Sequence, residues 1–161
     1  MNKATITRAL RGSILALALT SMMVGTVLAT GATGFVGTAL SRGPLAESVH
    51  FNTGEVKLQT KGDVDIATSS VAISPLGSSG WHEHPGVVLV TVKLGTVTFY
   101  DENCVATIHA TGTSFIEAAG DGPGLARNES ATEPAMVYAT YIVPAGAALR
   151  IDTPNPGCPQ N

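Results

Sequence analysis

From residue 55 onwards, short apolar segments alternate with turn-forming residues. Residues 55–60 (EVKLQT) place apolar Val56 and Leu58 between polar neighbours, which is the period of a strand with one buried face. Further strands are predicted at 64–74, 86–94, 96–100, 104–110, 113–118, 135–144 and 147–152. Glycine, proline, asparagine or aspartate stands in nearly every gap. About eight short strands at this spacing predict an all-β sandwich or barrel.

The composition narrows the class of protein further. The chain has 161 residues, enough for one domain, and only 13% of them are charged. A disordered chain would combine few apolar residues with a high net charge, whereas here 44% of the residues are hydrophobic. The formal net charge is −3, so there is no basic excess to attract nucleic acid, and no nucleic-acid partner is expected.

The first 29 residues have the pattern of a secretory signal peptide. Lys3, Arg8 and Arg11 precede an uncharged apolar run at 14–29, which ends in Val-Leu-Ala, a plausible cleavage site. A run of this length is also long enough to stay in a bilayer as a membrane anchor. Both alternatives predict a secreted or extracytoplasmic protein, anchored in the second case, whose remaining domain does not itself enter the membrane. Cleavage after residue 29 would remove three basic and no acidic residues, changing the net charge from −3 to −6.

Residues 26–40 resemble the opening of a dinucleotide-binding fold, because Gly31, Gly34 and Gly37 follow an apolar stretch. That fold would need several helices downstream, and no long segment of helical period follows residue 50. We therefore interpret 30–49 as a linker, 50–153 as the β-barrel and 154–161 as a C-terminal tail.

The two cysteines, Cys104 and Cys158, predict one disulfide bond if the chain is exported. In the alternative they are unrelated thiols. Cys158 lies in a proline-rich tail (TPNPGCPQN) that has few apolar residues to hold it against the domain. A bridge over a loop of this length contributes roughly 4 kcal/mol in the chain-entropy model.

The densest chemistry of the chain lies at residues 78–86 (SSGWHEHPG). His82 and His84 are two residues apart, so on a strand both imidazoles point to the same face while Glu83 points to the other. Such a pair can chelate one metal ion, and imidazole suits several transition metals. The alternative is a polar barrel mouth in which the two rings bond to each other, to water or to a ligand.

Residues 80–86 (GWHEHPG), the strand after them and Gly95 resemble the first motif of the cupin superfamily, in which a glycine and HxH precede a glutamate and a later glycine. Residues 112–117 (GTSFIE), Gly120 and residues 125–128 (LARN) resemble its second motif. The resemblance covers 50–153. It implies a cupin-type jelly-roll β-barrel, with His82 and His84 facing inward near the mouth, and makes a homodimer worth testing.

Two of the four metal ligands that the resemblance implies are missing. Val88 stands where the first motif has glutamate, and Gly124 or Pro123 stands where the second motif has its histidine. Glu117, His109 and Asp121 are the candidates to complete the shell. The favoured set is His82, His84 and Glu117, holding one divalent ion such as Zn, Mn, Fe or Ni.

Three further side chains are candidates for binding a small-molecule ligand. They are Trp81, His109 and Arg127, each of which has an alternative role: barrel packing for Trp81, a hydrogen bond on the barrel wall for His109 and a surface charge for Arg127. Residues 128–130 (NES) also form a glycosylation sequon, a triplet that arises often by chance.

Three functions are compatible with this sequence, since one scaffold hosts many activities. The first is an exported cupin that holds a small ligand or a divalent metal in its barrel through His82 and His84. The second is a metal-dependent enzyme, an oxygenase or isomerase, that uses the pair with a substitute carboxylate. The third is a structural barrel without a ligand. No catalytic residue is assigned.

Overall fold

The computed structural model describes residues 29–45 and 47–160, and its secondary structure there consists of strands alone. The predicted signal peptide or anchor lies outside these ranges except for residue 29. Among the described residues no helix is long and apolar enough to cross a membrane. The all-β fold class predicted from the hydrophobic pattern is therefore confirmed.

Three strands, β1, β4 and β11, have ten or more residues, and the others are shorter. In chain order they are β1 (Thr33–Pro44), β2 (His50–Asn52), β3 (Lys57–Gln59), β4 (Val64–Ser78), β5 (His82–Glu83), β6 (Val87–Leu94), β7 (Thr96–Tyr100), β8 (Ala106–Ala110), β9 (Ser114–Ala118), β10 (Leu125–Arg127), β11 (Ala135–Pro144) and β12 (Ile151–Asp152).

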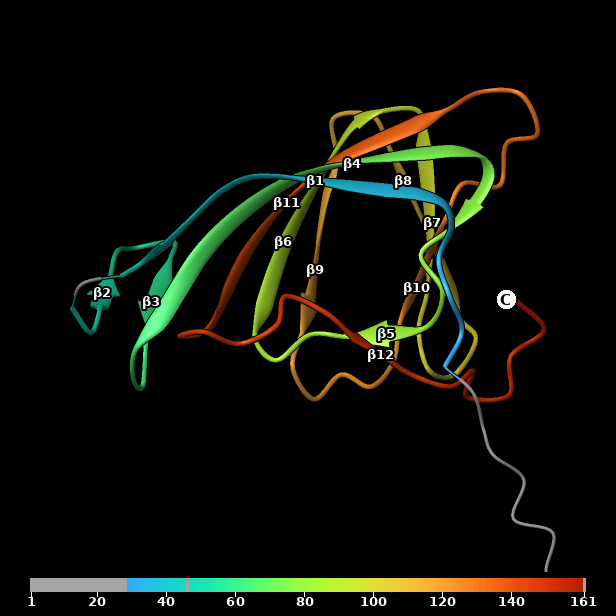
Figure 1. Cartoon of the computed structure of the whole chain (residues 1–161). Helices are drawn as coiled ribbons and strands as arrows, with labels where there is room; N and C mark the ends of the chain where they lie inside the picture. The colour runs from blue at the N-terminus through green and yellow to red at the C-terminus, as the bar shows by residue number, and fades with distance from the viewer. Residues whose placement is uncertain (1–28, 46, 161) are drawn as a thin grey trace, which may run out of the picture.

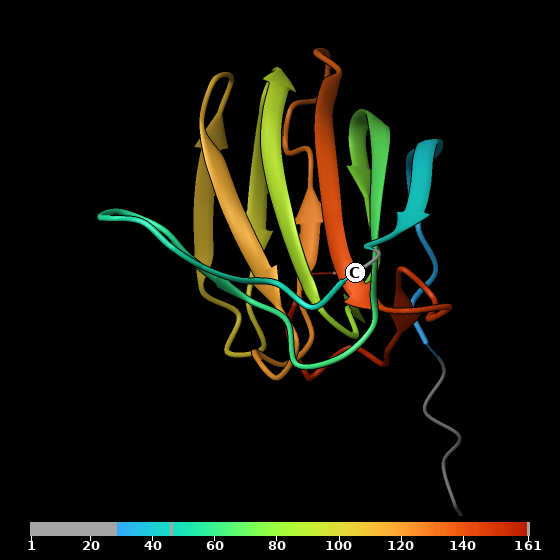
Figure 2. The same cartoon turned by 90° about the vertical axis from the view of Figure 1, so that its left-hand side faces the viewer.

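Most of the strands form one antiparallel sheet, in the order β8-β7-β10-β4-β11-β6-β9, with β1 paired to β4 (Figure 1). The two ends of this path, β8 and β9, are consecutive in the chain and are joined by the short turn 111–113. The backbone N–H of Gly112 in that turn donates to the carbonyl of Val92 on β6. The sheet therefore curls until its edges meet and forms a nearly closed barrel (Figure 2).

The core follows from the two-residue period of the long strands. Along β4, β6 and β11 buried and solvent-facing residues alternate, as expected for strands with one face turned inward. The buried residues of the central cluster are Val71, Ile73, Val88, Val90, Val92, Val97, Ala126, Ala135, Val137 and Ala139, with Phe35, Phe99, Phe115 and Tyr141 packed against them.

The segment 30–49 was predicted as a linker, but most of it forms strand β1. This strand pairs with β4 along nearly its whole length, from Thr33 opposite Ser78 to Pro44 opposite Asp65. Its glycines and small side chains hide a clear alternation, and two register shifts interrupt its pairing. Gly34 and Gly37 lie within this strand, so they do not form a phosphate-binding turn.

The C-terminal tail is fastened by the predicted disulfide bond, which is confirmed between Cys104 and Cys158. Cys158 packs with Trp81 and Leu125 in a second buried cluster, beside the main core. The indole N–H of Trp81 donates to the carbonyl of Gln160, 3.0 Å away. The tail therefore shields Trp81, the residue before the HxH pair, from solvent.

Asn128 organises the loop that precedes β11. Its side-chain amide is 1% exposed and donates to the carbonyls of Ile73, Ser74 and Glu133, while its oxygen accepts from the N–H of Ser130. Because this buried amide is inaccessible to a glycosyl donor, we do not expect the sequon at 128–130 to be modified in the folded protein. Asn128 has a structural role instead.

The first prediction concerns this side chain. Asn128→Ala should lower the free energy of unfolding by about 2–3 kcal/mol, since it leaves several buried backbone groups without partners. Ser130→Ala, which alters the same loop on its exposed side, should cost less than about 1 kcal/mol. Urea denaturation of both variants measures the difference, and equal losses would contradict the role assigned to Asn128.

Candidate metal centre

The HxH pair lies on β5, a short strand between two backbone constraints. Gly80 has a φ of 68°, and a side chain there would collide with the carbonyl of Thr30. At Gly86 a side chain would collide with the carbonyl of Ile142 on β11. Both positions therefore require glycine, because the backbone is either left-handed or closely packed. These constraints hold β5 across the mouth of the barrel.

Each imidazole of the pair is oriented by a backbone carbonyl. Nδ1 of His82 lies 3.0 Å from the carbonyl oxygen of Gly80, and Nδ1 of His84 lies 2.6 Å from that of Leu149. A carbonyl only accepts hydrogen bonds, so Nδ1 must carry the proton in both rings. When the rings are neutral, each Nε2 then has a free lone pair. This is the usual arrangement of histidines that bind metal ions.

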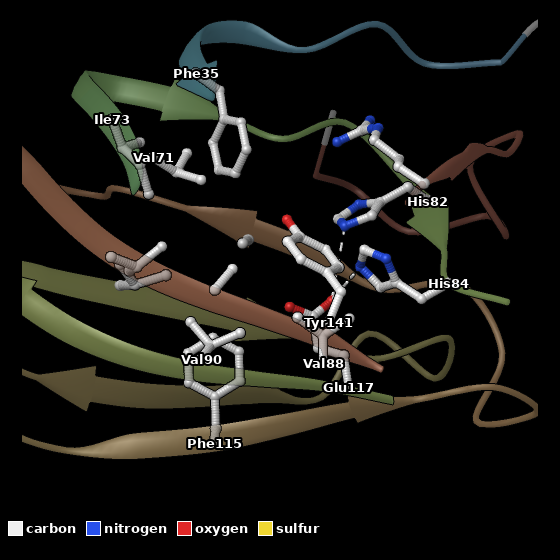
Figure 3. A pocket seen from close by; sticks show the side chains of 15 residues that line it. Phe35, Val71, Ile73, His82, His84, Val88, Val90, Phe115, Glu117 and Tyr141 are labelled. Carbon is white, nitrogen blue, oxygen red and sulfur yellow. Dashed lines mark ion pairs between the residues drawn. The ribbon is translucent and has the colours of Figure 1, made fainter. Parts of the chain in front are cut away.

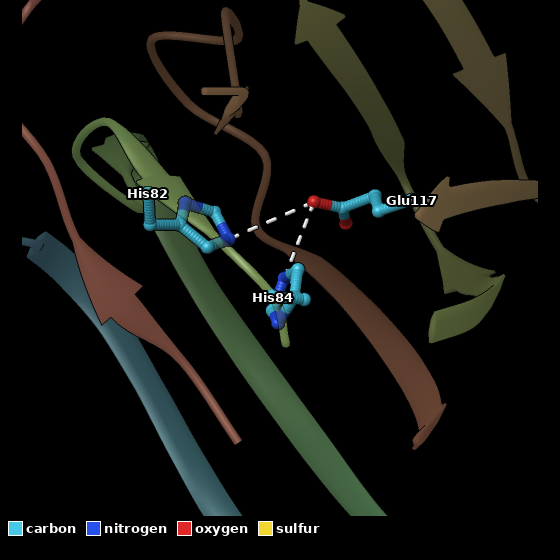
Figure 4. Close-up of side chains that lie close together, drawn as sticks. All are labelled: His82, His84 and Glu117. Atoms are coloured by element: carbon cyan, nitrogen blue, oxygen red, sulfur yellow. Dashed lines mark ion pairs between the residues drawn. The ribbon is translucent and has the colours of Figure 1, made fainter. Parts of the chain in front are cut away.

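Glu117, on β9, faces the two histidines (Figure 4). Its Oε2 lies 3.6 Å from Nε2 of His82 and 3.4 Å from Nε2 of His84. Glu117 is the direct cross-strand partner of Val88 on β6, so the two side chains share the inward face of the barrel. The carboxylate missing at Val88 is thus supplied by the neighbouring strand.

The burial of His82 decides its protonation. The side chain is 5% exposed, and this burial is the main reason that the pKa of His82 falls from the ordinary 6.5 to about 4, although the Glu117 carboxylate opposes the shift. At neutral pH the Nε2 lone pair of His82 therefore points at a carboxylate that also only accepts. A cation placed between them would satisfy both groups.

The position of the missing second-motif histidine is filled by an aromatic ring. Gly124 exchanges two backbone hydrogen bonds with His82, so it lies directly beside the pair. A side chain on Gly124 would collide with the ring of Phe99 on β7. Asp121, the other candidate near this position, lines the adjoining cavity but does not belong to the cluster of ligand atoms. The set His82, His84 and Glu117 is the one such cluster found in the described residues, and its ligand atoms lie within 4.8 Å of one another.

The cluster separates two cavities. The inner one, of ≈ 60 Å³, extends into the barrel and has mostly apolar walls that include Phe35, Val90 and Phe115 (Figure 3). The outer one, of ≈ 220 Å³, opens beside the loop 119–124 and has Asp101 and Asp121 among its lining residues. His82, His84 and Glu117 line both cavities, so groups bound between them would be reachable from either side.

Two residues of the inner cavity were not anticipated from the sequence. Tyr141 follows Val137 and Ala139 on the inward face of β11, and its ring centroid lies 5.7 Å from that of His84. The two-residue period of β11 was sufficient to find it. Arg150, whose guanidinium donates to the carbonyl of Ser79, precedes β12 and carried no sequence signal of its own.

The three predicted ligand-binding residues lie outside both cavities. Trp81 is fully buried under the tail. His109, on β8, stacks on Phe115 with ring centroids 4.2 Å apart. Arg127, on β10, forms an ion pair with Glu129. The structure thus gives each of them a packing or ionic partner, and their ligand-binding role stays a prediction.

The buried His82 makes the stability of the metal-free protein depend on pH. The folded pKa of about 4 lies below the ordinary 6.5, so the unfolded chain takes up a proton first as the pH falls. The stability is full above pH 6.5 and declines towards pH 4, with a loss of about 2 kcal/mol between pH 7 and 5 from this group. His82→Gln should lack that part of the loss in urea titrations, and an NMR titration midpoint of His82 near 6.5 would contradict it.

Comparisons with known proteins give structural likeness only. No protein-family model matches the sequence, and no curated protein matches it. A protein with a double-stranded β-helix domain from Klebsiella pneumoniae is 20% identical, with a TM-score of 0.48 over 55% of this chain and 74% of its own. A cupin superfamily protein from Desulfitobacterium hafniense has 9% identity and a TM-score of 0.48, over 68% of this chain and 77% of its own.

A polyketide cyclase from Streptomyces resistomycificus has 13% identity and a TM-score of 0.48, over 73% of this chain and 75% of its own. Two features of this chain agree with the motif resemblance of its sequence. Its sheet closes into a small barrel, and the HxH pair faces inward at the mouth, as the motif resemblance implies. The chain therefore has the all-β barrel fold that the cupin resemblance of its sequence implies, with a possible His/His/Glu metal site at the mouth.

Proposed function

We propose that this protein is an exported cupin that binds one divalent metal ion through His82, His84 and Glu117 and admits a small ligand to that ion from the outer cavity. The observation that carries the proposal is the convergence of three ligand atoms, two of them held in the metal-binding tautomer by backbone carbonyls.

The spacing of these atoms suits a common ion. Two ligand atoms about 2.1 Å from one metal, at the tetrahedral angle, lie about 3.4 Å apart. The Glu117 oxygen lies 3.4 and 3.6 Å from the two Nε2 atoms, and the whole set lies within 4.8 Å, so the side chains would draw together around a bound ion. Two imidazoles and one carboxylate suit Fe²⁺, Mn²⁺, Zn²⁺ or Ni²⁺, and such a set leaves coordination positions open.

The open positions would face the cavities, which supports a ligand-binding role. The outer cavity, of ≈ 220 Å³, has the size for a small molecule and lies directly beside the three ligands. A barrel with a purely structural role would be expected to fill its mouth with side chains. The Cys104–Cys158 disulfide supports export, because such bonds persist in oxidising compartments.

Metal content tests the proposal. Purified wild-type protein reconstituted with each of the four ions should hold about one equivalent of at least one of them. His82→Ala, His84→Ala and Glu117→Ala should each lower the affinity 100-fold or more, because a direct ligand is lost. His109→Ala, a histidine outside the cluster, is the matched control and should keep full occupancy. Less than a tenth of an equivalent in the wild type would refute the proposal.

A further prediction uses the pairing of Val88 with Glu117. Glu117→Val should abolish metal binding, and Val88→Glu in the same chain should restore it in part, because the two positions lie opposite each other on one face. We expect the double variant to bind at least tenfold more tightly than Glu117→Val alone. Isothermal titration with the ion preferred by the wild type measures this. No recovery in a folded double variant would show that the site depends on the backbone of β9 itself.

A further inference from the structure

The segment 149–160 contacts the HxH pair at its start and Trp81 further along. The carbonyl of Leu149 accepts from Nδ1 of His84. Asp152 pairs with His82 in the two-stranded ladder of β12 and β5, and the N–H of Thr153 donates to the carbonyl of Trp81. This segment, which we call the C-terminal strap, therefore lies against the strand that carries both histidines.

The disulfide bond holds the far end of the strap. Cys104 lies in the turn after β7, where the carboxylate of Asp101 accepts from the N–H groups of Asn103 and Val105. Beyond Thr153 the strap is also held by the Ala29–Pro154 bridge, by the buried cluster around Cys158 and by the bond from Trp81 to Gln160. Loss of the disulfide would thus release the far end of the strap from the turn after β7.

We propose that the disulfide-bonded strap is the positioning element of the metal site, so that the affinity for a divalent ion depends on the Cys104–Cys158 bond. This inference rests on the proposed function. The mechanism is the loss of orientation: when the strap moves, Leu149 no longer holds the Nδ1 proton of His84, and the pairing that fixes His82 on β5 loosens. The ligand side chains themselves remain unchanged.

The coupling makes metal loading sensitive to the redox state of the compartment. A dithiol reductant would transfer two electrons and two protons to the bridge, giving two protein thiols and leaving the reductant as a disulfide. In a reducing compartment the chain would bind the ion weakly, and in an oxidising one it would bind the ion at full affinity. Metal uptake would then follow oxidative folding.

The central experiment compares wild type with Cys104→Ser/Cys158→Ser. The probe is Mn²⁺ alone, because this hard ion binds thiolates poorly and its free form is counted by electron paramagnetic resonance. We expect the dissociation constant to rise about 10- to 100-fold in the double variant, the range for the loss of groups that orient metal ligands. A change of less than twofold would overturn the inference.

The control separates positioning from general destabilisation. Val92→Ala weakens the main core at a residue that lines neither cavity. It should change the thermal stability but leave the Mn²⁺ affinity within twofold of the wild type. If Val92→Ala lowers the affinity as much as the cysteine double variant does, the disulfide acts only through stability and the inference is wrong.

A measurement on the wild type serves if the double variant does not fold. Binding free energies around a closed cycle must sum to zero, so bound Mn²⁺ must make the disulfide harder to reduce by the same factor that reduction weakens Mn²⁺ binding. We expect the dithiol-to-disulfide ratio at half-reduction to rise about tenfold or more with saturating Mn²⁺. Trp81, the single tryptophan, should shift its emission to longer wavelength on reduction.

The results also separate this inference from the proposed function. If oxidised wild type binds no Mn²⁺, Zn²⁺, Fe²⁺ or Ni²⁺, the proposed function fails, and this inference fails with it. If oxidised wild type binds Mn²⁺ but the half-reduction ratio is the same with and without the ion, only the positioning role of the strap is overturned.

Discussion

The pairing register between β6 and β9 is the constraint on which the candidate centre depends. It sets Glu117 opposite Val88 and so turns a strand-face carboxylate toward two histidines that come from another part of the chain. Because side chains alternate along a strand, a slip of one residue would send Glu117 to solvent and bring an apolar side chain into the centre. The site therefore depends on the pairing register of β6 and β9 as well as on the ligand residues themselves.

The apolar interior of the barrel beneath the centre changes the electrostatic environment of its ionisable side chains. Burial keeps His82 neutral at a pH where an exposed histidine would begin to take up protons, and it places a carboxylate beside two unshared electron pairs. In water such an arrangement would be relieved by solvent, but here the groups are largely enclosed. The interior therefore holds the carboxylate and the imidazoles in an arrangement that a cation placed between them would satisfy.

Much of the fold was predictable, because period-two alternation and turn residues report directly on strands that bury one face. The HxH pair, Glu117 and the disulfide were also found among the candidates from residue type and approximate place. Strand β1 was missed, since its glycines, threonine and small side chains hide the alternation, and its pairing with β4 is a long-range contact. The choice of Glu117 over His109 and Asp121 needed the register of β6 and β9, and the roles of Leu149 and Arg150 depend on backbone geometry that residue type does not encode.

The short ladder around Trp81 also joins the two ends of the described chain. Ala29 bridges to Pro154, and the N–H of Thr30 donates to the carbonyl of Thr153. These contacts join residues more than a hundred positions apart in the described part of the chain, and they close beside the histidines. During synthesis β5 emerges well before Leu149, so a nascent chain carries the imidazoles without the carbonyl that orients one of them. The order of translation thus makes this corner of the barrel one of the last parts of the domain to be completed.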